Sequence, residues 1–275
     1  MIKEHIIITL NLSRQYICTE CQGVSDMLQA TIQADIFRET IDAVSALVNE
    51  CRLHLTANGI RTITVDTSNV AMVSLELAAS AFESYSLSVE SAEIGLDIEK
   101  IRSMMGMIGK ADVISLDLDD SGKKLKLSFG GYEYSITLLD TKTIRKDPNA
   151  PNLNLPATFE IAGVMFNDAI KASGMVSDKI SLAVSGETRV FTMNAEGDSD
   201  RIKRELAGDD VHYITCADAR SLFSLDYLKD MGKSISRAEK VQIRLGNDHP
   251  VQFSFEYAEG KGKIGYLLAP RIEAD

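Results

Sequence analysis

The sequence predicts an α+β fold made of two similar units that are joined by an extended connector. The first observation is the order of the expected elements (strand, helix, strands, helix, strands), which occurs twice along the chain. The second is an internal period of roughly 125 residues, by which LKLSF matches VQFSF and Ile41 matches Ile170. The third is segment 140–158, which holds three of the five prolines and separates the two halves.

The composition is that of a globular protein with one large domain or two domains of ordinary size. The chain has 275 residues, of which 45% are hydrophobic and 25% are charged. No apolar run is long enough to span a membrane and no leader precedes a cleavage site, so we expect a cytoplasmic protein. The net charge of −11 argues against nucleic-acid binding over the whole surface, but it permits a local basic lining.

Residues 1–26 do not fit the pattern of the rest of the chain. IIITL is a short strand-like run, and Cys18 and Cys21 have the C-x-x-C spacing of a zinc or redox site. A zinc site needs four ligands and His5 is the only nearby addition, so we expect no metal and no cofactor. We interpret 1–26 as an extension that is disordered or a misassigned start, with Met27 as the functional start.

The first unit is expected over residues 27–142. Asp35 caps its first helix, which carries an apolar stripe at helical spacing, namely Phe37, Ile41, Val44 and Val48. A second helix begins near Leu96 and buries Ile98, Ile101, Met105 and Ile108. The expected strands are LQATIQA, IRTITV after the Asn58-Gly59 turn, residues 71–77, and DVISLDL, KLKLSF and YEYSITLL.

The second unit is expected over residues 158–275 and repeats this order. TFEIA is its first strand, and VMFNDAIKASGM is a helix that turns Phe166, Ala169 and Ile170 inward. KISLAV, TRVFTM and IKREL are further strands. The last helix is expected over about 218–232, with an apolar side made of Leu222, Leu225, Leu228 and Met231. VQIRLG, VQFSFEY and KIGYLLA are the closing strands.

The connector between the units, 143–157, is expected to be extended and semi-rigid, because proline removes backbone donors and fixes φ. Leu153 and Leu155 alternate with two asparagines, so an extended chain turns both leucines to one side. Two interpretations stay open. The leucines either pin the connector to the protein or form an exposed apolar edge for a partner peptide.

Catalytic motifs are incomplete in this sequence, so we expect a protein that is not an enzyme. Gly232-Lys233-Ser234 resembles the end of a phosphate-binding loop, but the glycine that this loop needs at position 227 is Tyr227. The histidines are far apart in sequence, and none has a partner at metal-ligand spacing. A site assembled between the two units remains an alternative, which turnover by the purified protein would reveal.

Basic residues gather on the polar faces of the expected helices, whereas strands and loops carry most of the acid. One interpretation is an ordinary helix surface with ion pairs, because Asp42, Glu99, Asp226 and Asp230 are interspersed. The other is that all four helices face one way and form a weakly basic wall, which contacts phosphates without reading bases. The basic residues are Arg38, Lys100, Arg102, Lys110, Lys171, Arg220, Lys229, Lys233 and Arg237.

Several segments resemble proliferating cell nuclear antigen, the DNA sliding clamp family, in its archaeal form. They are VDTSNVAMVSLEL at 65–77, the helix LDIEKIRSMMGMIGKAD, the connector ending NLNLP and the terminal GYLLAPRIE. The resemblance runs from about Met27 to Glu273. It implies a processivity factor without catalytic activity: a homotrimeric ring of six similar domains around duplex DNA, with helices lining the hole and antiparallel sheets forming the rim. Retention by ring closure is compatible with a charge of −11.

The resemblance also implies that the ring closes head to tail by pairing of two edge strands. One strand is 132–138, with Tyr132, Tyr134 and Ile136; the other lies near 199–207, with Arg201, Lys203 and Arg204. These basic residues are expected to meet acidic ones such as Glu133 and Asp140 of the next copy. A clamp subunit that acts only in a heterotrimer with paralogous subunits stays open as the alternative.

The same resemblance implies two binding surfaces. Lys171 and Lys233 match the DNA-facing positions best, and the full DNA-facing set is Lys100, Arg102, Lys110, Lys171, Arg220, Lys229 and Lys233. The sequence departs from the family at Arg38-Glu39, Ser103 and Gly106. The connector is expected to dock replicative DNA polymerase, clamp loader, flap endonuclease and DNA ligase through short peptides, in a pocket made of Val65, Val70, Met72, Leu153, Leu155, Pro156, Pro250, Ala269, Pro270 and Ile272.

Overall fold

The computed structural model of the chain describes residues 26–272, and the predicted extension with its C-x-x-C pair lies almost entirely outside them. The first half of the described chain contains nine strands and two α-helices. In order they are β1 (Leu28–Gln33), α1 (Ala34–Ser45), β2 (Glu50–Thr56), β3 (Gly59–Val65), β4 (Ala71–Ala78), β5 (Ser84–Leu87), β6 (Ser91–Asp97), α2 (Ile98–Met104), β7 (Val113–Leu118), β8 (Lys124–Phe129) and β9 (Tyr132–Thr137).

The second half repeats this order element by element. Its members are β10 (Ala157–Ile161), α3 (Gly163–Ser173), β11 (Lys179–Ser185), β12 (Val190–Glu196), β13 (Arg201–Leu206), β14 (His212–Thr215), β15 (Ala219–Ser224), α4 (Leu225–Ile235), β16 (Val241–Leu245), β17 (Val251–Tyr257) and β18 (Gly262–Leu268). The predicted α+β fold of two similar units is therefore confirmed. The division at 142 and 157 stays a prediction, since the structure has neither helix nor strand between β9 and β10.

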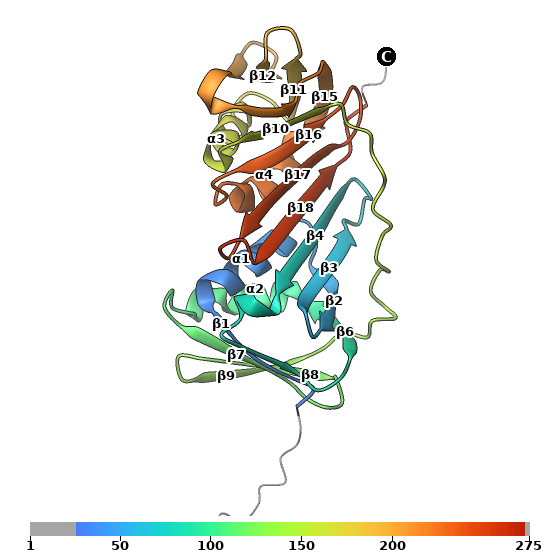
Figure 1. The fold of residues 1–275 in the computed structure, drawn as a ribbon, viewed down its shortest axis with the longest axis vertical. Helices are drawn as coiled ribbons and strands as arrows, with labels where there is room; N and C mark the ends of the chain where they lie inside the picture. The colour runs from blue at the N-terminus through green and yellow to red at the C-terminus, as the bar shows by residue number, and fades with distance from the viewer. Residues whose placement is uncertain (1–25, 273–275) are drawn as a thin grey trace, which may run out of the picture.

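The strands form three antiparallel sheets, of which the central one joins the two repeats (Figure 1). Its order is β14-β10-β16-β17-β18-β4-β3-β2-β6, so β18 of the second repeat pairs with β4 of the first. In this junction Tyr266 lies opposite Val73 and Gly265 lies opposite Ser74. The other two sheets, β5-β1-β7-β8-β9 and β13-β12-β11-β15, cover the two ends of the molecule.

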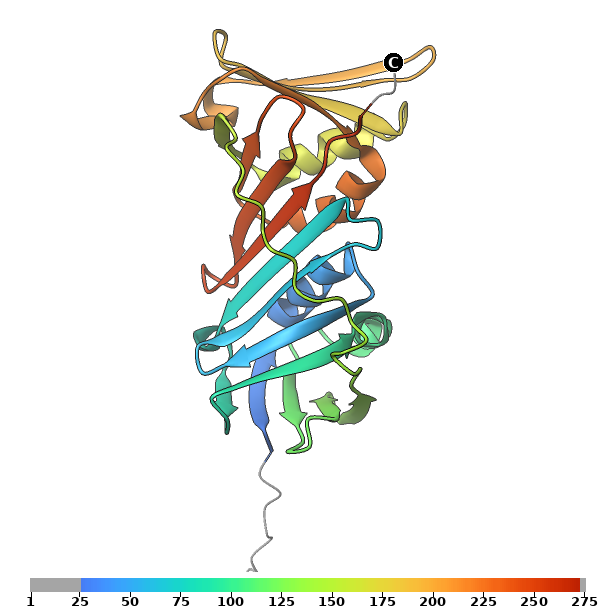
Figure 2. The ribbon, with the colours of Figure 1, turned by 90° about the vertical axis from the view of Figure 1, so that its right-hand side faces the viewer.

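All four helices lie on one face of the central sheet, and the connector crosses the opposite face (Figures 1 and 2). α1 packs against both α2 and α4, and α4 packs against α3, so the helices form a continuous layer. This arrangement follows from the amphipathic sequence of the helices, each of which buries one apolar face. The buried residues include Phe37, Ile41 and Val44 of α1, and Leu225, Leu228, Met231 and Ile235 of α4. The polar faces of the helices are left to solvent.

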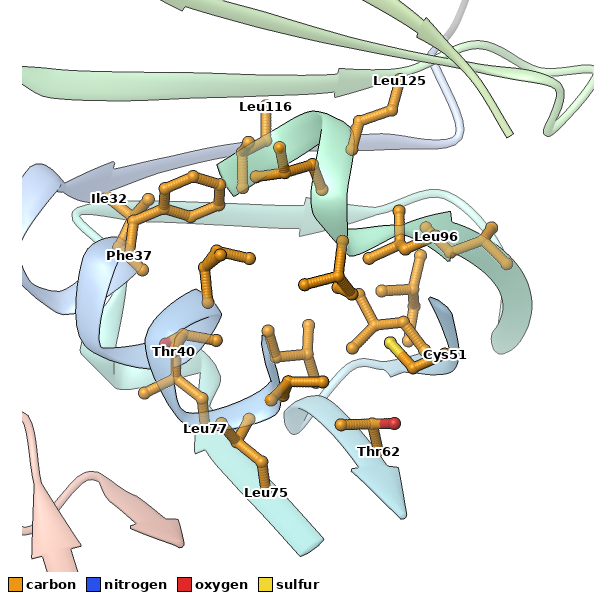
Figure 3. A pocket seen from close by; sticks show the side chains of 18 of the residues that line it. Ile32, Phe37, Thr40, Cys51, Thr62, Leu75, Leu77, Leu96, Leu116 and Leu125 are labelled. Carbon is orange, nitrogen blue, oxygen red and sulfur yellow. The ribbon is translucent and has the colours of Figure 1, made fainter. Parts of the chain in front are cut away.

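The core of the first repeat contains a small apolar cavity. A cavity of about 60 Å³ lies between the two sheets and α1, lined by apolar side chains that include Leu96 and Ile60 (Figure 3). By the element order and strand registers of the two repeats, Leu96 corresponds to Phe223 and Ile60 corresponds to Phe191. Both phenylalanines are fully buried. Aromatic rings therefore occupy in the second repeat the space that stays open in the first.

The structure corrects several expectations about single elements. The N-cap of α1 is Gln33, whose side chain makes no capping hydrogen bond, and Asp35 lies in the first turn. The helix ends at Ser45, so Val48 lies beyond it. The last helix begins at Leu225 rather than near 218, because residues 219–224 form β15 with alternating buried and exposed side chains. β2, β5, β6 and β14 were not expected as strands.

Candidate functional site

The helical layer carries most of the predicted DNA-facing residues. Lys100 and Arg102 lie on α2, Lys110 in the turn that follows it, Lys171 on α3, and Lys229 and Lys233 on α4, all exposed. Acidic neighbours offset part of this charge. Lys100 pairs with Asp97 at 3.0 Å, Lys229 with Asp226 at 3.6 Å and Lys233 with Asp42 at 3.4 Å. Acidic and basic side chains are therefore almost balanced on the four helices, and exposed cations alternate with carboxylates across the layer.

Two arginines assigned to the helix faces have other positions or roles. Arg220 lies on β15, and its Nε donates to Ser181 Oγ at 3.2 Å on a sheet surface. The prediction that Arg220 belongs to a helical DNA-facing row is therefore wrong, for the same reason that the start of α4 was misplaced. Arg38 donates to the Met105 and Ile108 carbonyls at 3.1 and 3.0 Å, so it holds the end of α2.

Within residues 26–272, no group of three or more His, Cys, Asp and Glu is placed to hold a metal ion. In that same range, no helix has the length and apolar character needed to cross a bilayer. The predicted C-x-x-C pair, Cys18 and Cys21, lies outside this range.

The connector is fastened to the sheet at both ends. Arg52 donates to the Ile144 and Arg145 carbonyls at 2.8 and 2.9 Å, and His54 Nε2 lies 2.7 Å from the Asp147 carboxylate. At the other end the Leu155 side chain is 4% exposed, and Arg244 reaches the carbonyl of half-buried Leu153 at 3.4 Å. Residues 149–152 between these anchors are exposed. Leu155 therefore pins the connector, whereas Leu153 keeps part of its surface free.

The predicted partner-pocket residues gather where the connector, the first repeat and the C-terminus meet. Strand registers put Val65 opposite Met72 and Met72 opposite Leu267, and the Ala269 amide donates to the Val70 carbonyl at 2.9 Å. Leu155 closes against Gly246 in the turn that leads to Pro250. Ile272, at the end of the described chain, is 89% exposed. An apolar row thus runs across the connector face of the sheet.

A buried carboxylate organises the loop at the edge of this row. Asp66 accepts hydrogen bonds from the amides of Ser68, Val70 and Ala71 at 2.7–3.0 Å and from the Tyr227 hydroxyl at 2.7 Å. Burial alone would raise the pKa of Asp66, but these hydrogen bonds outweigh it and hold the pKa below its ordinary value. The loop of the first repeat is thereby tied to α4 of the second.

Sequence reasoning missed several residues that shape these surfaces. Leu267 completes the apolar row, and its place in the alternation of KIGYLLA was the available signal. Arg145 donates to the Asp66 carbonyl at 2.9 Å and to Asn69 at 2.7 Å, which joins the connector to the same loop. No sequence pattern indicated that contact, because the partners are 79 and 76 residues apart.

Two of the six edge strands in the described sheets carry the predicted interface residues. β9 is the edge of the first end sheet, where Tyr132 and Tyr134 are 58% and 37% exposed while Ile136 is buried. β13 is the edge of the other end sheet, and its Arg201, Lys203 and Arg204 are exposed. The predicted interface residues therefore lie on two unpaired edges at opposite ends of the molecule (Figure 1).

Comparison with known proteins accounts for this architecture. Residues 27–146 match the family model of the proliferating cell nuclear antigen N-terminal domain, and residues 149–271 match that of its C-terminal domain. A DNA polymerase sliding clamp of Methanocorpusculum labreanum is 85% identical over 249 residues, which are 90% of this chain and 100% of that protein. The chain belongs to the proliferating cell nuclear antigen family.

Other members of the family agree in length and fold. A DNA polymerase sliding clamp of Methanosphaerula palustris is 58% identical over the same share of both chains. A solved structure described as the C-terminal region of FEN-1 bound to A. fulgidus PCNA is 34% identical, with a TM-score of 0.84 over 90% of this chain and 100% of that one. PCNA from Thermococcus kodakaraensis has a TM-score of 0.80 at 22% identity, over 89% of this chain and all of its own, and supports the fold alone.

Proposed function

We propose that this chain is a DNA sliding clamp, in which three copies close into a ring around duplex DNA and tether replication and repair enzymes without catalysing a reaction. Support comes from membership in the family, from the sliding clamps among its relatives, and from the helices gathered on one face of a continuous sheet. Encirclement retains the protein on DNA without tight binding, which suits a helical surface on which acidic and basic side chains are almost balanced.

The observation that carries the ring is the correspondence between the internal junction and the two free edges. β18 pairs with β4 inside the chain. By element order and register, β9 is the counterpart of β18 and β13 is the counterpart of β4. β9 of one copy can therefore pair with β13 of the next in the same antiparallel way. This contact is heterologous, and it forms a ring when the rotation between copies closes.

The internal junction also supplies the expected register between copies. Tyr134 corresponds to Tyr266 and Ile202 corresponds to Val73, so Tyr134 is expected opposite Ile202. One position along, Glu133 is expected opposite Lys203. The Tyr134 ring would then be covered by the neighbouring copy as Tyr266 is covered inside the chain. A cross-strand pair of opposite charges adds about 0.2–1 kcal/mol.

The DNA-facing role is proposed for Lys100, Arg102, Lys110, Lys171, Lys229 and Lys233, because they are exposed on the helical layer. Their carboxylate neighbours limit the phosphate affinity, and no side-chain pattern for reading base edges is needed for sliding. Replacing both Lys171 and Lys233 by alanine is expected to weaken DNA binding at low salt while leaving peptide binding unchanged. Unaltered low-salt DNA affinity of the double variant would reject this role.

Partner docking is proposed for the apolar row beside the connector. The row combines Val65, Met72 and Leu267 from three neighbouring strands with Leu153 from the connector. It suits a short peptide that inserts a hydrophobic side chain. Replicative polymerase, clamp loader, flap endonuclease and ligase are the partner classes we propose, and the solved relative bound to the C-terminal region of FEN-1 supports the third.

A homotrimer is the version that the residues support. The two edges that must meet in the ring are present in one chain, and their expected register sets an acidic residue against a basic one within the same sequence. A heterotrimer of paralogous subunits would not require the two edges of one chain to be complementary to each other. Mixing with paralogous subunits, if the genome encodes any, distinguishes the two assemblies.

The test of the proposed function has two parts. Sedimentation of the purified protein at micromolar concentration is expected to give the mass of three chains. Protein loaded on circular plasmid by a clamp loader is expected to stay bound and to escape when the plasmid is linearised. A monomer at all concentrations, or escape that does not depend on linearisation, would contradict the ring.

A further inference from the structure

The junction inside the chain is closed by an ion-pair cluster on its helical face. There α1 of the first repeat packs against α4 of the second. The Asp42 carboxylate lies 3.4 Å from Lys233 Nζ and 2.6 Å from an Arg237 guanidinium nitrogen, and its side chain is only 10% exposed. One anionic group thus joins two cations across the junction.

The repeat assigns a counterpart to each member of this cluster. α1 aligns with α3 through Ile41 and Ile170, which sets Asp42 against Lys171. α2 aligns with α4 through their first residues, Ile98 and Leu225. By this alignment Gly106 is the counterpart of Lys233, and Lys110 is the counterpart of Arg237.

A second contact supports this alignment. In the first repeat Arg38 of α1 donates to the Met105 carbonyl at 3.1 Å. Its counterpart in α3, Asn167, lies 3.3 Å from the carbonyl of Gly232, the counterpart of Met105, when its amide is oriented to donate there. In that orientation the amide oxygen accepts from Lys171 Nζ at 3.0 Å. The helix pairs of the two repeats therefore pack in the same register.

The junction between copies consequently has the opposite electrostatic character. Where the internal junction brings Asp42 to Arg237, the junction between copies brings Lys171 of one copy to Lys110 of the next. Both side chains are exposed, and neither takes part in an ion pair among residues 26–272. Asp168 corresponds to Glu39, which lies near enough to Arg237 to interact with it electrostatically but forms no ion pair with it in the described chain. Asp168 therefore offsets part of the positive charge without replacing Asp42.

We propose that each junction between copies carries an anion site formed by Lys171 of one copy and Lys110 of the next, which binds one phosphate group of the DNA backbone. The site rests on the proposed ring, since neither copy completes it alone. A phosphate between Lys171 and Lys110 supplies the negative charge that Asp42 supplies inside the chain, because two cations brought together favour an anion between them. The DNA backbone thereby strengthens the closed ring at its weakest junctions.

Charge reversal at the two positions tests this site. Lys171→Asp and Lys110→Asp each convert the repulsion into an attraction, so each single variant is expected to lower the dissociation constant of the trimer by about three- to tenfold at low salt. The double variant restores like charges and is expected to return to the wild-type value. Lys142→Asp, a charge reversal at an exposed residue just before the connector, is the matched control and is expected to leave the trimer unchanged.

A second readout uses inorganic phosphate and a short DNA duplex as probes. Both are expected to tighten the wild-type trimer and the control variant, and to lose this effect in the single and double variants. Single variants whose trimers are unchanged or weaker, or a phosphate effect that survives in them, would overturn the site. A wild-type protein that forms no trimer would instead overturn the proposed ring, so the two failures are distinguishable.

Discussion

At the scale of single residues, Asp66 connects the loop of one repeat with a helix of the other. Its carboxylate is buried, yet its two oxygens accept four hydrogen bonds, three from backbone amides and one from Tyr227. The free-energy cost of burying such a carboxylate as an anion is small, because these donors replace the hydrogen bonds that water would make. The same contacts fix Val70, a member of the proposed partner surface.

Replacing Asp66 by asparagine is expected to lower the free energy of unfolding by about 2 kcal/mol near neutral pH, because a charged acceptor is lost. The pKa of Asp66 is lower in the folded than in the unfolded state, so its stabilisation is complete above about pH 4 and is lost as the pH falls through the lowered folded value. Urea unfolding at constant protein concentration and at several pH values measures this. A gap between wild type and variant that stays the same below about pH 4 would contradict the assignment.

The same scale explains where residue assignments from sequence succeed or fail. Lys171 and Lys233 lie on helices whose apolar stripes were evident, so their exposed position could be predicted. Arg220 could not be placed, because ARSLFS carries both a strand alternation and a plausible helix start. The contact of Arg145 with the 66–69 loop depends on the path of the whole connector and has no local signal.

At the scale of elements, the connector shows that two neighbouring leucines have different roles. Leu155→Ala is expected to lower the free energy of unfolding by about 2–5 kcal/mol, because it empties a buried site. Leu153→Ala is expected to change stability little and to weaken binding of a peptide from the C-terminal region of a FEN-1 protein. Thermal unfolding and calorimetry separate these effects. Unchanged peptide affinity of the Leu153 variant would remove the connector from the partner surface.

The cavity of the first repeat makes a separate prediction about stability. Leu96→Phe copies the residue that fills the equivalent place in the second repeat and is expected to raise the free energy of unfolding by about 1 kcal/mol (Figure 3). The matched change, Phe223→Leu, is expected to lower it by removing contacts from a filled core. Differential scanning calorimetry compares the two. A destabilised Leu96→Phe variant would mean that the site does not admit the ring.

Whether an element could be predicted depends on the length and strength of its hydrophobic pattern. The four helices and the long alternating strands could be predicted because each has several apolar residues at one spacing, although the start of the last helix was placed too early. The duplication could be predicted because the order of these elements occurs twice. β5 and β14 are four residues long and mostly exposed, so SYSL and HYIT carry too little periodicity. The joining of the two repeats into one central sheet through β18 and β4 could not be predicted, because strand alternation does not specify which strands pair.

At the scale of the whole molecule, the internal junction supplies the register that we expect for the proposed junction between copies. Glu133→Lys is expected to weaken the trimer by setting like charges against each other across β9 and β13, and Lys203→Glu is expected to have the same effect. The two changes combined restore opposite charges and are expected to recover the trimer. Native mass spectrometry follows all three variants. Failure of the combined variant to recover would mean that the register differs from that of β18 and β4.

The continuous pairing of β18 with β4, reinforced by the connector, has a consequence for how an assembled clamp comes apart. In the proposed ring, every second junction is the internal one, which is bridged by the covalent chain and by the backbone hydrogen bonds between β18 and β4. Dilution therefore dissociates only the junctions between copies. In the proposed assembly, dissociation releases intact single chains, each of which forms a third of the ring. Opening for DNA entry is a hinge motion at a junction between two chains and leaves the internal junction of each chain intact.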